Sequence, residues 1–128
     1  MRFAIKSDDD IITSRAAVKE MAREAGFGIV EQTMIATAVS ELTRNIVKYA
    51  GEGLLYIRLL NEADRTGLEF VCEDRGPGID DIEQTMQAGF STGNGLGMGL
   101  SGARKLMDEF SIESESGKGV RVVARKWL

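Results

Sequence analysis

Histidine is absent from this chain of 128 residues, and cysteine, proline and tryptophan each occur once. Without histidine the chain can build neither a Ser-His-Asp triad nor a histidine-ligated metal site, and it cannot phosphorylate itself on histidine. The single Cys72 cannot form an internal disulfide, which is typical of a reducing, cytoplasmic environment. Because Cys72 lies in an apolar run, we interpret it as a small core residue rather than a reactive thiol.

Long apolar runs and basic clusters are also missing. No run approaches the roughly 20 residues that a membrane-spanning helix needs. The N-terminus turns acidic by Asp8, so we expect no signal peptide. The net charge is -4, which argues against nucleic acid as the main partner. What the chain does have is 43% hydrophobic residues in the length of one ordinary domain, so we predict a single domain over residues 1–128.

Hydrophobic periodicity predicts an alternation of helices and strands. We expect a two-layer α/β sandwich, with helices on one face of a mixed sheet. In the first helix Ile12, Ala16, Val18 and Met21 are expected on the apolar side, and in the second helix Tyr49 continues the apolar stripe. The expected strands are 1–6, 54–60, 68–73, 110–114 and 120–127. The expected helices are 9–25, 30–49, 80–88 and 99–109. Residues 61–67 are expected to form a turn, and residues 89–98 a mobile loop.

The stretch around Asp74 combines an apolar run with a tight turn. Residues 68–72 are apolar, Asp74 follows, and Gly76 and Gly78 flank the only proline, Pro77. Proline fixes its own φ, whereas glycine allows close backbone approaches that other residues prevent. The pattern predicts a carboxylate above a turn that a flat ligand can approach, where it can accept a hydrogen bond from an exocyclic amine. The alternative is a plain strand-to-turn corner with a solvated acid.

Glu41 and Asn45 are four residues apart in the predicted helix 30–49 and therefore share a face, with Lys48 close to it. Charged groups on a helix are usually just solvated, which is the alternative interpretation. Asn45, however, interrupts an apolar stripe. Its amide oxygen is a suitable ligand for Mg²⁺, which keeps several waters and is normally shared with substrate phosphates.

Three alternating glycines, Gly95, Gly97 and Gly99, precede the predicted helix over 99–109. A helix N-terminus presents free amide groups and the positive end of the helix dipole to an anion. The pattern therefore predicts a phosphate chain against residues 95–100. A flexible lid without ligand contact is the alternative.

In this order and at these separations, the three stretches resemble the N, G1 and G2 boxes of the Bergerat (GHKL) ATP-binding fold of gyrase, MutL and the histidine kinases. The chain is more specifically similar to the small serine/threonine kinases of bacterial partner-switching systems, above all to the RsbT-type switch kinases of the stressosome. The matching text is Ser-Glu-Leu-x-Arg-Asn at 40–45, Glu-Asp-x-Gly-Pro-Gly-Ile at 73–79, Gly-Phe-Ser-Thr-Gly at 89–93 and Gly-Ala-Arg-Lys-Leu-Met-Asp-Glu-Phe at 102–110.

The resemblance implies ATP held between the helices, with a lid over its phosphates. It implies Glu41 as the general base for the acceptor hydroxyl, Asn45 as the Mg²⁺ ligand and Asp74 as the acceptor of the adenine amino group. Lys48 would reach a phosphate, and Tyr49 would lie by the base, although Tyr49 also suits the core. The implied nucleotide-binding set is Asn45, Lys48, Tyr49, Asp74, Gly76, Gly78, Ile79, Gly95, Leu96, Gly97, Met98, Gly99 and Leu100.

Two positions depart from the family pattern. Anti-sigma relatives often carry an arginine in the lid, and none lies between Gly89 and Leu100. Arg104 or Lys105 can supply that cation or can equally lie on the exposed helix face. Many members also have Gly-Thr in the final hairpin, where the threonine contacts adenine through water. Here the pair is Gly119-Val120, which leaves that contact without its usual residue.

The predicted function is transfer of the γ-phosphate of Mg-ATP to a serine or threonine of a STAS-domain antagonist or scaffold protein. The added charge would release the kinase, which would then bind and activate a downstream PP2C-type phosphatase. Self-association as a homodimer is left open. One alternative is an anti-sigma factor that sequesters a sigma subunit and phosphorylates its antagonist. Another is a nucleotide-gated switch with negligible turnover, which would have no need of Glu41 as a base.

Overall fold

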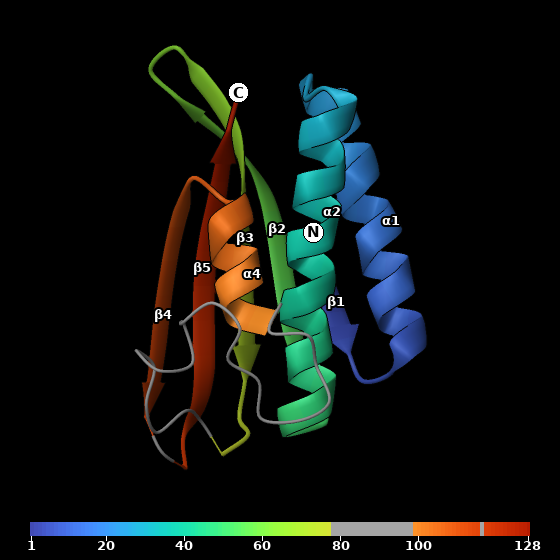
Figure 1. Cartoon of the computed structure of the whole chain (residues 1–128), viewed down its shortest axis with the longest axis vertical. Helices are drawn as coiled ribbons and strands as arrows, with labels where there is room; N and C mark the ends of the chain where they lie inside the picture. The colour runs from blue at the N-terminus through green and yellow to red at the C-terminus, as the bar shows by residue number, and fades with distance from the viewer. Residues whose placement is uncertain (78–98, 116) are drawn as a thin grey trace.

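A single sheet covered by helices organises the chain (Figure 1). The computed structural model describes residues 1–77, 99–115 and 117–128. In these ranges five strands form a sheet in the order β1-β2-β3-β5-β4. The elements are β1 (Arg2–Ile5), α1 (Asp8–Ala25), α2 (Ile29–Asn45), the π-helix η1 (Ile46–Ala50), β2 (Gly53–Glu62), β3 (Arg65–Asp74), α4 (Gly99–Leu106), β4 (Glu109–Glu115) and β5 (Gly119–Trp127).

The two-layer α/β sandwich is confirmed. The helices α1, α2 and α4 pack over one face of the sheet, where β3 presents buried Leu68, Phe70 and Cys72. The expected mixed sheet is wrong in its strand directions, because every pairing among the described strands is antiparallel. Tight hairpins join β2 to β3 and β4 to β5, and a hairpin can only make antiparallel neighbours.

The β2–β3 hairpin is longer than the sequence predicted. Residues 61–67 were expected to form a turn, but strand pairing continues to Glu62 and Arg65. Only Ala63 and Asp64 remain in the turn, with Ala63 at a positive φ of 50°. The polar residues of this stretch suggested a turn, but they form paired strands. Polar side chains are tolerated there because this end of the hairpin extends beyond the helices and has no core to face (Figure 1).

Helix α1 begins and ends close to the predicted residues, but its buried face is different. The Asp10 carboxylate accepts hydrogen bonds from the backbone N–H groups of Lys6 and Ser7, and Gly26 ends the helix at φ 105°. Ile12 was expected in the core, yet it is 66% exposed. Ala16 is exposed as well, whereas Val18 is buried as expected. The buried positions face α2 and are Ile11, Ser14, Val18 and Ala22.

Two further helix boundaries differ from the prediction. The α-helical part of the second helix ends at Asn45, and the last turn is π-helical. The helix predicted over 99–109 ends at Leu106, because the Asp108 N–H donates to the Arg125 carbonyl and draws the chain into β4. The predictions for residues 80–88 and 89–98 fall outside the described residues. Among those that are described, no helix is both long and apolar enough to cross a membrane.

Candidate active site

Asp74 is the last residue of β3 and begins the predicted turn. Its Oδ1 accepts a hydrogen bond from the Gly76 N–H at 2.9 Å, which fixes the orientation of the half-buried carboxylate. This is the local side-chain-to-backbone bond by which aspartate commonly shapes a turn. Arg75 is exposed, as expected for a residue without a role in the site. The turn therefore holds one carboxylate oxygen and leaves the group ready to accept another donor.

Three glycines lie tightly against Asp74 and its neighbour Glu73. A β-carbon on Gly53, which pairs with Asp74 across the sheet, would come within 2.4 Å of the Glu73 carbonyl oxygen and 3.2 Å of the Asp74 β-carbon. A β-carbon on Gly119 would come within 2.1 Å of the Asp74 carbonyl oxygen. One on Gly76 would lie 3.3 Å from Asp74 Oδ1. The absence of side chains at Gly53 and Gly119 lets the starts of β2 and β5 pack closely against the end of β3, which carries Asp74.

The same corner packs directly against the end of the α2–η1 segment. A β-carbon on Gly76 would come within 2.6 Å of the Ala50 β-carbon, at the end of η1. A β-carbon on Gly53 would come within 2.8 Å of Ile46 Cγ2. Ile46 directly follows Asn45, so the helix carrying Asn45 adjoins the corner carrying Asp74.

The β4–β5 turn is tied to this corner as well. The Gly117 N–H donates to the Pro77 carbonyl oxygen at 2.6 Å, and Gly119 lies at a positive φ of 94°. A hollow of about 1190 Å³ opens beside the corner, with Gly53, Asp74 and Gly119 among its walls. Neither Glu41 nor Asn45 is among the described residues that line it. Its wall includes one cross-strand row, Ala4, Leu54, Glu73, Arg121 and Glu113, on the sheet face opposite the buried Leu55, Cys72 and Val122. The hollow therefore opens mainly on the outer face of the sheet, away from α2.

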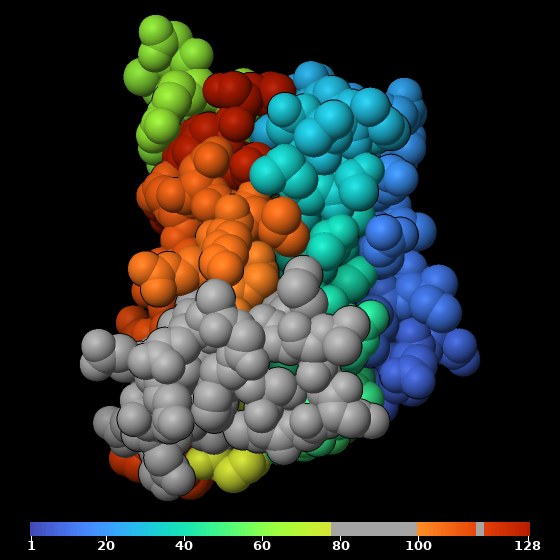
Figure 2. Space-filling model, viewed as in Figure 1, coloured from blue at the N-terminus to red at the C-terminus, as the bar shows by residue number. Residues whose placement is uncertain are grey.

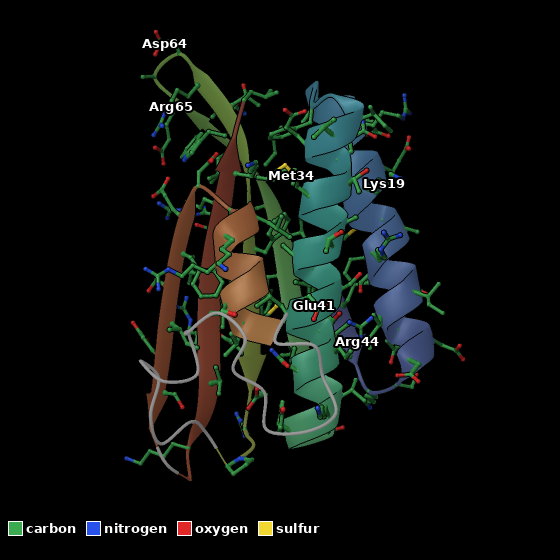
Figure 3. All side chains as sticks on the ribbon, viewed as in Figure 1. Lys19, Met34, Glu41, Arg44, Asp64 and Arg65 are labelled. Carbon is green, nitrogen blue, oxygen red and sulfur yellow. The ribbon has the colours of Figure 1, made fainter. Side chains whose placement is uncertain are left out.

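Glu41 and Asn45 lie one turn apart on α2, as predicted. The Glu41 side chain is 18% exposed, and its Oε1 accepts a hydrogen bond from Arg44 Nη1 at 2.7 Å (Figure 3). Asn45 is half-buried, and its side-chain amide has no hydrogen-bond partner within the described part of the chain. A free amide oxygen fits a hard cation such as Mg²⁺, and a carboxylate held by one arginine keeps a second oxygen for a proton.

Tyr49 was predicted to continue the apolar stripe of the second helix, but the helix becomes π-helical directly after Asn45. A π-turn holds more residues than an α-turn, so side chains beyond Asn45 leave the expected apolar stripe. Tyr49 is 46% exposed, and its place in the core is therefore wrong. Lys48 is also exposed, with Nζ 5.2 Å from the centroid of the Tyr49 ring. The structure thus brings Lys48 and Tyr49 together at the surface, directly after Asn45.

Helix α4 lies beside α2 on the same side of the sheet, and their surfaces are continuous in the space-filling view (Figure 2). It begins at Gly99, and Leu100 and Ala103 are buried. Arg104 and Lys105 are exposed in its last turn, at the end opposite Gly99. The predicted site residues outside the described ranges are Gly78, Ile79, Gly95, Leu96, Gly97 and Met98.

Cys72 behaves as predicted. It is 4% exposed, and burial, together with the nearby charges of Asp74 and Glu73, raises the pKa of its thiol to about 12. A thiol with such a pKa remains protonated at neutral pH and is a poor nucleophile. Cys72 is therefore a core residue.

Sequence reasoning did not identify the roles of Gly53 and Gly119. Both stand at the start of a strand, where a glycine often marks the close approach of another backbone. That signal was available for both residues, but it does not say which backbone approaches. Only the sheet pairing shows that it is the backbone around Asp74.

Comparison with known proteins gives a consistent result. Residues 6–126 match the family model described as histidine kinase-like ATPase domain. The chain is 48% identical over 124 residues to the serine/threonine-protein kinase RsbT of Bacillus subtilis, covering 97% of this chain and 93% of that protein. It is 33% identical over 134 residues to the anti-sigma F factor of Caldanaerobacter subterraneus, covering 100% of this chain and 92% of that protein.

A solved structure supports the fold. The mycobacterial sensor histidine kinase MprB superposes with a TM-score of 0.59 at 16% identity, covering 99% of this chain and 96% of that one. At this identity the likeness concerns the arrangement of helices and strands. It confirms the expected two-layer sandwich independently of the three sequence motifs.

Proposed function

Because the chain belongs to the family of histidine kinase-like ATPase domains, we propose that Asp74 and Asn45 hold opposite ends of one ATP molecule. Asp74 accepts the adenine amino group, and Asn45 faces the phosphates. The first residues of α4, Gly99 and Leu100, meet the phosphate chain with their backbone N–H groups. Lys48 and Tyr49, which follow Asn45 closely in the chain and are exposed at the surface, contact the nucleotide from η1.

The chain is an ATP-dependent serine/threonine kinase of the partner-switching type. In its reaction the acceptor hydroxyl oxygen attacks the γ-phosphorus, and the bond from that phosphorus to the β,γ-bridging oxygen breaks. ADP leaves with the bond electrons. We assign the hydroxyl proton to the free oxygen of Glu41, while Arg44 holds the other oxygen at 2.7 Å. When bound, Mg²⁺ supplies positive charge that stabilises the phosphate oxygens, and Asn45 would hold it.

One observation carries the assignment of Asp74 and Asn45 to a single site: the direct packing of the Asp74 corner against the α2–η1 end. Gly76 lies against Ala50 and Gly53 lies against Ile46 so tightly that neither position has room for a β-carbon. Asp74 and Asn45 are thus carried by two segments that pack directly against each other, which supports the proposal that one ligand contacts both. Such pre-arranged groups bind a ligand without a large ordering cost.

The acceptor in this proposal is a serine or threonine of a STAS-domain antagonist or scaffold protein. Phosphorylation adds about two negative charges to the partner surface. The kinase itself has a net charge of -4, so the modified partner is repelled and the kinase is released. The released kinase then binds and activates a PP2C-type phosphatase.

The test is incubation of the chain with Mg-ATP labelled at the γ-phosphate and with purified STAS-domain proteins. The expected result is label on one serine or threonine, located by mass spectrometry, and labelling that is roughly 10²- to 10⁴-fold slower with the Glu41→Gln variant. Label on the kinase alone, or transfer that is equally fast with Glu41→Gln, contradicts the proposal.

A second candidate function is sequestration of a sigma subunit, which the 33% identity to an anti-sigma F factor favours. The two functions separate in one experiment, in which the ATP-bound chain is mixed with purified sigma subunits. A stable complex that requires ATP would support the anti-sigma function, whereas phosphotransfer without such a complex supports the switch kinase.

A further inference from the structure

Lys126 is a lysine on the core-facing side of the sheet. It lies on β5 opposite Leu68, follows buried Ala124, and is only 9% exposed. A buried ammonium group loses its hydration and is retained only where polar partners replace the lost water. The partners of Lys126 therefore indicate why a cation stands at this position.

Those partners lie at the C-terminal end of α4. Lys126 Nζ donates to the Leu106 carbonyl oxygen at 3.1 Å and lies 3.6 Å from Asp108 Oδ1. Asp108 in turn accepts a hydrogen bond from the Trp127 N–H at 2.7 Å and donates its own N–H to the Arg125 carbonyl at 2.9 Å. The end of α4 is thus fastened to three consecutive residues of β5.

The contact replaces an ordinary helix cap. Leu106 is the last residue of α4, and its carbonyl is one of the acceptors that a helix leaves without an internal partner. Many helices solve this with a glycine just beyond the end, but Met107 and Asp108 follow here. A cation at this end also complements the negative end of the helix dipole. From the neighbouring strand β5, Lys126 both donates a hydrogen bond to the Leu106 carbonyl and places a positive charge at the negative end of the helix dipole.

We propose that Lys126 is a positioning residue that sets the placement of α4, and through it the Gly99–Leu100 end that meets the ATP phosphates. The inference rests on the phosphate position in the proposed function. A helix of this length spans roughly 12 Å as a stiff rod, so fixing one end determines where the other end points. Misplacing groups by about 1 Å can cost up to roughly a hundredfold in activity.

Stability alone does not require a lysine here. An apolar side chain of similar length would fill the same space, and such replacements of buried ion pairs are often neutral or stabilising. Asp108 is 43% exposed in its side chain, so losing Lys126 would not leave a fully buried carboxylate unpaired. Arg104 and Lys105 also lie near this end of α4, but both are exposed, and neither bonds to the sheet within the described ranges 1–77, 99–115 and 117–128.

The experiment compares Lys126→Met, which keeps the apolar stem, with Lys126→Arg, which keeps a cationic donor. Lys19→Met makes the same chemical change at a half-buried lysine of α1 and is the matched control (Figure 3). Binding of ATP and of adenosine is measured by calorimetry in the presence of magnesium. Backbone amide exchange is followed separately in α4 and α2.

Lys126→Met should weaken ATP binding by about tenfold or more, leave adenosine binding at the parent value and speed exchange in α4 but not in α2. Lys126→Arg should recover most of the ATP affinity, and Lys19→Met should match the parent. Unchanged ATP affinity, an equal loss of ATP and adenosine, or unchanged α4 exchange in Lys126→Met would overturn the inference. If instead the parent binds adenosine as tightly as ATP, the phosphate position in the proposed function is what fails.

Discussion

The backbones of Gly119 and Asp74 approach so closely that a β-carbon on Gly119 would come within 2.1 Å of the Asp74 carbonyl oxygen. The next nearest atom, the Arg75 α-carbon, would lie 2.9 Å away. Both neighbours are backbone and cannot rotate aside as a flexible side chain would. The start of β5 therefore packs directly against the backbone that carries the Asp74 side chain.

Gly119→Ala should lower both ATP affinity and folding stability, because the clash must push Asp74 out of place. Gly117→Ala is the matched control: Gly117 also has a positive φ, of 81°, but has open space where the β-carbon would go. Both variants share the strain of a positive φ, about 1–2 kcal/mol. Urea unfolding and calorimetry should show the excess loss only in Gly119→Ala; equal losses would mean that the contact with Asp74 is irrelevant.

Asp74→Asn should weaken ATP binding by about 1–3 kcal/mol, roughly 5- to 150-fold. The asparagine oxygen can still accept from Gly76, so the turn survives, but its amide group then faces the adenine amine donor to donor. The parent should also prefer ATP over GTP, because guanine presents a carbonyl oxygen to the carboxylate. Competition binding checks both points, and parity of ATP with GTP in the parent would contradict the assignment.

Asn45→Ala should abolish magnesium-dependent ATP binding while α2 stays folded, since alanine favours a helix. The loss should disappear when the metal is removed: with a chelator present, parent and variant should bind ATP equally weakly. Titrations with and without magnesium measure this difference. A variant that keeps the parent's magnesium response would exclude Asn45 as a ligand.

Glu41→Gln should bind ATP normally but transfer phosphate roughly 10²- to 10⁴-fold more slowly, because glutamine keeps the shape of glutamate without accepting a proton. The amide oxygen can still accept the hydrogen bond from Arg44. Glu31→Gln, in the first turn of the same helix, is the control and should retain activity. Single-turnover phosphotransfer with equal ATP occupancy makes the comparison, and a fully active Glu41→Gln would rule out the base.

Glu69 should make the fold sensitive to acid. It is 6% exposed on the outer face of the sheet, and hydrogen bonds from Arg58 at 2.6 Å and Arg125 at 2.7 Å lower the pKa of its carboxyl group. In the unfolded chain the pKa of a glutamate is about 4.3. Because the pKa of Glu69 is lower in the folded protein, its ionised form stabilises the fold at pH values above that unfolded-state pKa. This stabilisation is lost as the pH falls through the folded-state pKa.

Glu69→Gln should therefore be less stable than the parent near neutral pH and should lose less of its stability on acidification. Glu113→Gln, at an exposed position of β4 on the same face, should follow the parent curve. Unfolding free energies from pH 7 down to about pH 3 test this. Parallel curves for Glu69→Gln and the parent would show that the two arginines contribute nothing pH-dependent.

The sequence was sufficient to predict those features that depend on residues close together in the chain. The Gly26 end of α1, the shared face of Glu41 and Asn45, and the Asp74–Gly76 turn each depend on residues within four positions of one another. Periodicity also placed each described strand and helix. It failed at Ile12 and Tyr49 because their exposure depends on which face a neighbour covers and on a π-turn that no local pattern marked.

By itself, the sequence determined the order of elements, the family and the identities of the acid and amide that we place at the nucleotide. Only the tertiary structure decided that the strands run antiparallel, that Gly53 and Gly119 close around Asp74, and that Lys126 fastens the end of α4. The physical reason is sequence distance. Contacts within a few residues are encoded by spacing, whereas contacts between distant strands and helices arise only when hydrophobic burial has brought them together.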